Sequence, residues 1–225
     1  MKVGDLKWVV PALRREFESR RAPVMDLMAA QSADPFAILL GTILSARTKD
    51  ACTAGAIARL LEVADTPEKL GALPVAEIER LIYPVGFFHV KAQHLHELPA
   101  VLRERFGGVL PDTVEGLCEL PGVGRKTANL VVALGFRKPA ICVDIHVHRI
   151  SNRFGLVRTK TPFETEMALR KTLPEEYWMC WNSYIVAFGQ SRCTPRNPHC
   201  DGCPVAKWCD SRRGRKAAGG NPQAT

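Results

Sequence analysis

Apolar residues recur at helical spacing along most of the chain. They predict helices at residues 36–45, 50–64, 76–82, 90–106 and 174–188, with polar residues between them. Three local signals mark helix starts, each a capping residue followed by proline at the first helical position: Asp34, Thr66 and Thr161. No window shows the sustained two-residue alternation of a strand. The pattern therefore predicts an all-α fold.

The most informative stretch is residues 120–128, which read Leu-Pro-Gly-Val-Gly-Arg-Lys-Thr-Ala. Pro121 restricts φ, whereas Gly122 and Gly124 tolerate positive φ, as a tight turn requires. Apolar residues precede and follow the turn, so we predict a helix, a hairpin and a second helix that starts near Gly124. The hairpin amides and the helix N-terminus form a site suited to a phosphate, and Lys126 lies beside it.

Composition and charge narrow the class of protein. The chain has 225 residues, of which 46% are hydrophobic, so it has enough apolar sequence for a folded core. Its net charge is +8, which suits a nucleic acid or fits a generally basic protein equally well. It shows neither the apolar run of a signal peptide nor a stretch of roughly 20 apolar residues. We therefore expect a cytoplasmic protein with no membrane partner.

Four of the eight cysteines lie close together near the C-terminal end: Cys193, Cys200, Cys203 and Cys209. Four soft thiolates at such spacing predict a metal site, and the spacing alone leaves both zinc and iron–sulfur open. The other four, which are Cys52, Cys118, Cys142 and Cys180, lie in apolar contexts and are expected to be buried, inert thiols.

A second informative stretch is residues 140–150, where an apolar run ends at Asp144 and a helical pattern follows. Taken alone, this arrangement favours Asp144 as a helix N-cap. A capping carboxylate at the edge of a cleft would also remain available for chemistry, so the two roles are compatible.

Together these stretches resemble the endonuclease III family of helix-hairpin-helix DNA glycosylases. The hairpin, the Val-Asp-x-His pattern at residues 143–146 and the Cys-x6-Cys-x2-Cys-x5-Cys loop carry the resemblance. It implies Lys126 as the nucleophile and Asp144 as the catalytic carboxylate. It also implies a 4Fe–4S cluster on the four clustered cysteines. The implied DNA contacts of the hairpin are Gly122, Val123, Gly124 and Arg125.

Two further stretches are similar to the family's DNA-intercalating segments. Arg47 follows Ser45-Ala46 where the family pattern has Gln, and Phe87 stands where Leu is usual. The resemblance implies that Arg47 fills the gap left by an extruded nucleotide and that Phe87 stacks on the estranged base. A surface arginine and a core phenylalanine remain the alternatives.

The resemblance implies a bifunctional base-excision-repair enzyme. It would remove oxidised pyrimidines from duplex DNA and cut the abasic site by β-elimination through a lysine imine. The alternatives are a related glycosylase specialised for pyrimidine dimers or mismatches, and a non-catalytic DNA-damage-binding protein. We expect a monomer that acts on double-stranded DNA in the nucleoid.

The family fold implies two helical lobes. Residues 1–27 and 139–216 would form the iron–sulfur lobe, and residues 28–138 would form a helical barrel that ends in the helix-hairpin-helix. DNA would lie in the groove between them, with Lys126 and Asp144 on opposite walls. Residues 217–225 are expected to form a disordered tail.

Overall fold

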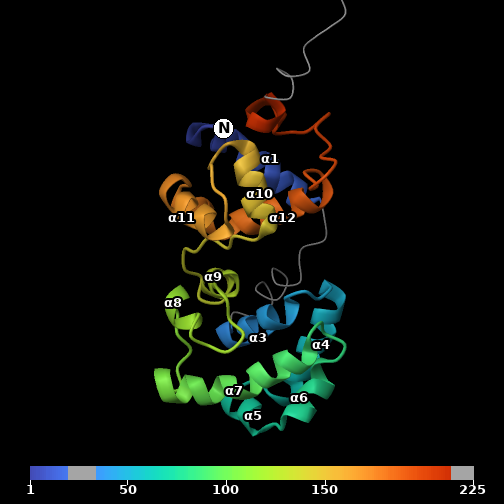
Figure 1. Ribbon diagram of the computed structural model, residues 1–225, viewed down its shortest axis with the longest axis vertical. Helices are drawn as coiled ribbons and strands as arrows, with labels where there is room; N and C mark the ends of the chain where they lie inside the picture. The colour runs from blue at the N-terminus through green and yellow to red at the C-terminus, as the bar shows by residue number, and fades with distance from the viewer. Residues whose placement is uncertain (20–33, 214–225) are drawn as a thin grey trace, which may run out of the picture. The chain divides into compact units, whose positions relative to one another are not determined.

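The computed structural model describes residues 1–19 and 34–213, and every regular element within these ranges is a helix (Figure 1). The all-α prediction is therefore confirmed. The chain divides into two compact units, which are the described parts of Met1–Ala22 with Ile141–Thr225 and of Pro23–Ala140. The predicted tail and the predicted lobe boundaries after residues 27 and 216 lie outside the described residues.

One unit is built around a helix that is buried along nearly its whole length. This helix is α3 (Pro35–Ser45), and its residues 36–44 are all buried. A helix that is apolar on every side must be surrounded by other elements, and here α3 contacts α4 and α9 as well as α7. The helices of this unit are α3, α4 (Asp50–Val63), α5 (Pro67–Ala72), α6 (Val75–Ile82), α7 (Phe88–Phe106), α8 (Val114–Leu117) and α9 (Arg125–Leu134).

The predicted helix starts are confirmed by their capping bonds. Asp34 accepts hydrogen bonds from the amides of Phe36 and Ala37, both at 3.1 Å. Thr66 and Thr161 each accept from the amide three residues ahead, at 3.3 and 3.2 Å. These contacts are local, which is why the sequence pattern predicts them.

The other unit packs α1 and α10 against α12. Its elements are a 3₁₀ turn η1 (Val3–Asp5), α1 (Leu6–Glu18), α10 (Ile145–Phe154), α11 (Pro162–Thr172), a 3₁₀ turn η2 (Glu175–Tyr177), α12 (Trp178–Ser191) and a 3₁₀ turn η3 (Ala206–Trp208). Trp181, Phe154 and Phe188 are its largest fully buried side chains. The single helix predicted at 174–188 is in fact a 3₁₀ turn followed by α12.

The helix α1 was not among the predicted elements. Its buried residues Leu6, Val9, Val10 and Leu13 do follow helical spacing, but Pro11 lies inside the helix and breaks the local signal. Packing of the apolar face outweighs the hydrogen bond that proline cannot make. None of the described helices combines the length and apolar composition needed to cross a bilayer.

Candidate functional site

The predicted helix-hairpin-helix is present as α8, a tight turn and α9. Gly122 has φ of 73°, and a Cβ at this position would lie 2.8 Å from Nδ1 of His94 on α7. Gly124 is the N-cap of α9 with φ of −94°, and a Cβ there would meet no atom within 4 Å. The turn therefore requires glycine at position 122, whereas position 124 would accept a side chain.

Lys126 is exposed in the first turn of α9, as the sequence predicts. Val123, in contrast, points into the unit, and its side chain is only 7% exposed. Its backbone amide donates to the Leu120 carbonyl at 3.1 Å. Arg125 contacts Glu115 of α8 at 3.5 Å. The first amides of an α-helix lack acceptors within the helix, so the N-terminus of α9 is the part of this motif suited to an anion.

Asp144 is the N-cap of α10. Its Oδ1 accepts from the amides of His146 and Val147 at 2.9 and 2.8 Å. The capping interpretation is therefore confirmed, and it uses one of the two carboxylate oxygens. Asp144 belongs to one compact unit and Lys126 to the other, and each is described within its own unit.

The structure brings Arg47 and Phe87 together although they are distant in sequence. The Arg47 guanidinium lies 5.4 Å from the centroid of the Phe87 ring. Both residues have left-handed backbones, with φ of 54° and 59°. Phe87 is 61% exposed, so the core-phenylalanine alternative is wrong. We call these two side chains the wedge pair.

Sequence reasoning missed Lys91, which lies on α7 and bonds to the residues on either side of Arg47, Ala46 and Thr48. Lysine side chains are almost never fully buried, yet Lys91, on the helix predicted at residues 90–106, is only 7% exposed. Burial lowers the pKa of Lys91 from 10.5 to about 8. No sequence signal distinguishes it from a surface lysine, because its acceptors come from a different helix.

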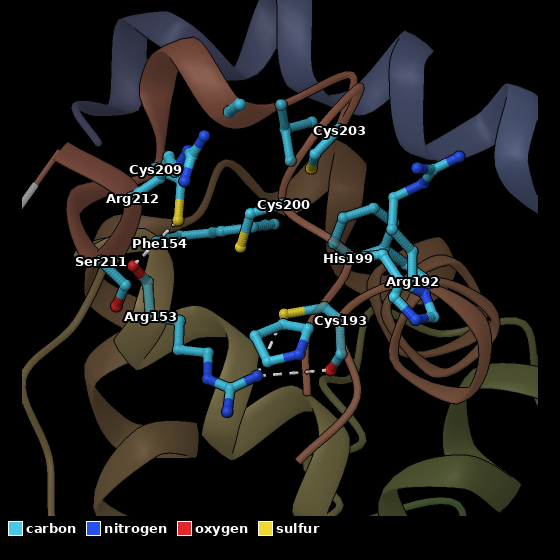
Figure 2. A pocket seen from close by; sticks show the side chains of 14 residues that line it. Arg153, Phe154, Arg192, Cys193, His199, Cys200, Cys203, Cys209, Ser211 and Arg212 are labelled. Atoms are coloured by element: carbon cyan, nitrogen blue, oxygen red, sulfur yellow. Dashed lines mark hydrogen bonds between the residues drawn. The ribbon is translucent and has the colours of Figure 1, made fainter. Parts of the chain in front are cut away.

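The four clustered cysteines line one pocket. Figure 2 shows their sulfur atoms around a common space, with Arg153 and Arg212 at its edge. No three His, Cys, Asp or Glu residues in the described ranges gather tightly enough for a single metal ion. A 4Fe–4S cluster takes one thiolate at each of its irons, so donors spread around a space fit it. Burial raises the pKa of the Cys203 and Cys209 thiols, so a metal must favour the thiolate form.

Arginines of α10 hold the cysteine loop. Arg153 donates to Sγ of Cys193 at 3.3 Å and to the Thr194 carbonyl at 2.7 Å. Arg149 donates to the Cys193 carbonyl at 3.0 Å and contacts Nδ1 of His146 at 3.1 Å. The helix that Asp144 caps is thus also bonded to the metal loop.

The basic residues of the cysteine loop differ in whether they are paired or exposed to solvent. Arg192 pairs with Glu16 of α1 at 3.1 Å, whereas Arg196, His199 and Lys207 are exposed. Among the cysteines outside the loop, Cys142 is buried, Cys52 and Cys180 are half-buried, and Cys118 is exposed. The expectation of burial is therefore confirmed for Cys142 and wrong for Cys118.

Comparisons with known proteins agree with this arrangement. The family model described as HhH-GPD superfamily base excision DNA repair protein matches residues 40–175. A second model, the iron-sulfur binding domain of endonuclease III, matches residues 193–209. These matches define the class of the chain as helix-hairpin-helix base-excision-repair proteins.

Individual relatives narrow the class. Endonuclease III of Thermotoga maritima is 46% identical over 185 residues, which cover 82% of this chain and 87% of that relative. A solved non-covalent endonuclease III–DNA complex has a TM-score of 0.81 and 32% identity, and covers 96% of this chain and 99% of its own. A trapped endonuclease III–DNA covalent intermediate, an estranged-adenine complex, has a TM-score of 0.74 and 35% identity. The match covers 85% of this chain and 95% of the solved one.

The chain belongs to the endonuclease III family. The choice that the cysteine spacing left open is thereby decided, and the metal group of the loop is a 4Fe–4S cluster.

Proposed function

We propose that this chain removes oxidised pyrimidines from duplex DNA, with Lys126 as nucleophile and Asp144 as catalytic carboxylate. Its activity is that of a bifunctional DNA glycosylase with abasic-site lyase activity in base excision repair. The observation that carries the residue assignment is the exposed Lys126 in the first turn of α9, next to the Gly122 turn.

A lysine nucleophile dictates the course of the reaction. The amine attacks C1′ of the sugar, and the damaged base leaves with the electron pair of the glycosidic bond. Opening of the sugar ring gives an imine between Lys126 and C1′. This imine acidifies the C2′ hydrogen, whose removal expels the 3′ phosphate and cuts the strand. A glycosylase that activates water instead has no imine and no lyase step.

The amine must lose its proton either before it attacks or as it does so. An unperturbed lysine has a pKa of about 10.4, so a shift to near 7 corresponds to about 4–5 kcal/mol. A helix N-terminus contributes only about 0.3–1 kcal/mol. Desolvation against bound DNA must therefore supply most of the shift, or a base must take the proton during attack.

The Asp144 carboxylate is suited to stabilise positive charge on the sugar. A negative charge near an ammonium favours the charged amine, which opposes activation of the nucleophile. The same charge stabilises the positive charge that develops on the sugar as the base departs. We therefore propose charge stabilisation as its main role and deprotonation of the nucleophile as its second.

The wedge pair suits the extrusion of the target nucleotide. An extruded nucleotide leaves a gap in the stack, and Phe87 exposes an aromatic face that can contact the estranged base. Arg47 adds charge and donors beside it. We propose that both side chains enter the duplex, and that Gly122, Val123, Gly124 and Arg125 form the hairpin that binds the DNA backbone.

We propose that Cys193, Cys200, Cys203 and Cys209 ligate the cluster and that its role is structural. The loop between them buries little besides Val205, which is fully buried, so metal binding supplies folding energy that a core would otherwise supply. Once ordered, the loop presents Arg196, His199 and Lys207 to phosphates.

The two compact units correspond, in this proposal, to the iron–sulfur lobe and the helical barrel of the family fold. Lys126 belongs to one of these units and Asp144 to the other. We further propose a monomer that works in the cytoplasm on the nucleoid, where reducing conditions keep thiolate ligands available.

Borohydride trapping tests the nucleophile. The wild-type chain should form a covalent adduct with duplexes that carry an abasic site or thymine glycol, because borohydride reduces the imine. Lys126→Gln should abolish the adduct and largely spare binding. Lys138→Gln is the matched control, because Lys138 is another exposed lysine of the same unit and pairs with Asp112.

Each outcome decides between the candidate functions. Trapping that survives Lys126→Gln would refute the nucleophile assignment. An adduct on the abasic site alone would keep the lyase and reopen the choice of damaged base, and pyrimidine dimers and mismatches would be tested next. Salt-sensitive binding with no cleavage at any lesion would favour the non-catalytic binder.

A further inference from the structure

The Lys91 ammonium is buried against the carboxyl end of a neighbouring helix. Its Nζ donates to the carbonyls of Leu44 and Ala46 at 2.8 and 2.6 Å, and lies 3.4 Å from Oγ1 of Thr48. The last carbonyls of a helix lack amide donors within the helix and carry partial negative charge. These oxygens therefore offset part of the free energy that it costs to bury the Lys91 ammonium away from water.

The charged surroundings of Lys91 are simple. The helix α3 has no ionisable side chain over Pro35–Ser45, so only its backbone faces the ammonium. From α4, the electrostatic interaction with Cys52 raises the pKa of Lys91, against the larger lowering by burial. Within the described residues, Lys91 forms no ion pair with a carboxylate. The ammonium is thus bonded to backbone and to one hydroxyl.

Two of the three oxygens that Lys91 contacts, those of Ala46 and Thr48, belong to the turn that carries Arg47, and the third ends the preceding helix α3. Within this turn the Thr48 hydroxyl accepts from the Gly86 amide at 3.1 Å. A Cβ at Gly86 would lie 2.5 Å from the Arg47 carbonyl oxygen, so the two backbones touch at this point. The next residue is Phe87. Lys91 therefore joins the segments that carry both members of the wedge pair.

The same segments have unfavourable backbone conformations. Only three non-glycine residues of the described chain have positive φ, and Arg47 and Phe87 are two of them. Non-glycine residues rarely adopt positive φ unless contacts with the surrounding structure hold the backbone there. The Lys91 contacts on one side and the Gly86 contact on the other are such structure.

We propose that Lys91 is a positioning residue that holds the turn of residues 46–48 against Gly86, so that Arg47 and Phe87 reach the duplex as a preformed pair. This inference rests on the proposed function of the wedge pair. A pair already ordered before binding loses less conformational freedom when it enters the gap at a lesion. Undamaged duplex, which offers no gap, would gain nothing from it.

The test uses the full chain with its cluster. Duplex containing a tetrahydrofuran abasic analogue binds without forming an imine, because the analogue lacks the C1′ hydroxyl. Its affinity divided by that for undamaged duplex gives a specificity ratio. Lys91→Met should lower this ratio about 10-fold, because Arg47 and Phe87 must then be ordered when they bind. Thr42→Val is the matched control, because it removes a buried polar group whose 2.7 Å bond to Ile38 stays within α3.

A double-mutant cycle separates positioning from general damage to the fold. If Lys91 acts through Arg47, Lys91→Met should change the ratio little in an Arg47→Ala background. Full additivity would overturn the proposal. Thr48→Val provides a milder second variant at a half-buried position, and it should also lower the ratio if the turn is what matters.

Hydrogen exchange distinguishes failure of this inference from failure of the proposed function. The Gly86 amide should exchange faster in Lys91→Met without DNA, and unchanged exchange would overturn the proposal. Faster exchange together with Arg47→Ala and Phe87→Ala variants of unchanged ratio would instead reject the wedge pair under Proposed function. The positioning of the turn by Lys91 would then stand.

Discussion

Two substitutions separate the capping role of Asp144 from its proposed chemical role. Asp144→Asn keeps an oxygen that can accept from the amides of His146 and Val147, and asparagine is about as good an N-cap as aspartate. It removes the negative charge. Asp144→Ala removes the charge and the acceptor together. The carboxylate chemistry should therefore fail in both variants, whereas the cap should fail only in the second.

The expected magnitudes follow from these contacts. Loss of charge at a helix N-terminus costs about 0.3–1 kcal/mol, and loss of a cap costs about 0.5–2 kcal/mol. We expect Asp144→Asn to lose up to about 1 kcal/mol and Asp144→Ala about 1–3 kcal/mol. For a chain of this size, each kcal/mol lowers Tm by about 2–4 °C. Both variants should slow single-turnover base release about 100-fold or more.

Thr161→Ala is the control for this experiment. Thr161 caps α11 in the same unit through its 3.2 Å bond from the Glu164 amide, and no reaction step uses it. It should lower Tm without slowing base release. Base release at the wild-type rate in Asp144→Asn, with a slow Asp144→Ala, would refute the reasoning, because the cap and not the charge would then be what catalysis needs.

Three further predictions concern the hairpin, the buried lysine and the cluster. Gly122→Ala should cost about 1–3 kcal/mol in thermal unfolding, because a Cβ with φ of 73° would lie 2.8 Å from His94, whereas Gly124→Ala should leave Tm unchanged or raise it. Burial lowers the pKa of Lys91 from 10.5 to about 8, so between these pH values the unfolded state holds a proton that the folded state has lost. The free energy of unfolding of the wild type should therefore rise relative to Lys91→Met by up to about 3 kcal/mol over this window, and parallel denaturant titrations would contradict the shift. The purified protein should be brown with absorbance near about 400 nm, and iron removal should bleach it and make residues 193–209 sensitive to protease; a colourless protein with one zinc would overturn the cluster.

The sequence alone was sufficient for the features that arise from local interactions. Helix spacing, the caps at Asp34, Thr66 and Thr161, and the glycine turn at residue 122 depend on contacts a few residues apart. The cysteine spacing predicts a metal group for the same reason, although only family membership chose iron–sulfur over zinc. Pro11 hid α1 from the sequence analysis, because proline disfavours a helix locally. Packing of the apolar face against residues distant in sequence outweighs this local preference.

Only the tertiary structure decided which side chains meet. Phe87 reads equally well as a core residue or an exposed one, and its exposure depends on how α7 packs. Lys91 reads as a surface lysine, but the end of α3 supplies carbonyl oxygens that make its burial possible. Arg47 and Phe87 form a pair because two backbones touch at Gly86. Such contacts join residues far apart in the chain, so their free energies leave no periodic pattern in the sequence.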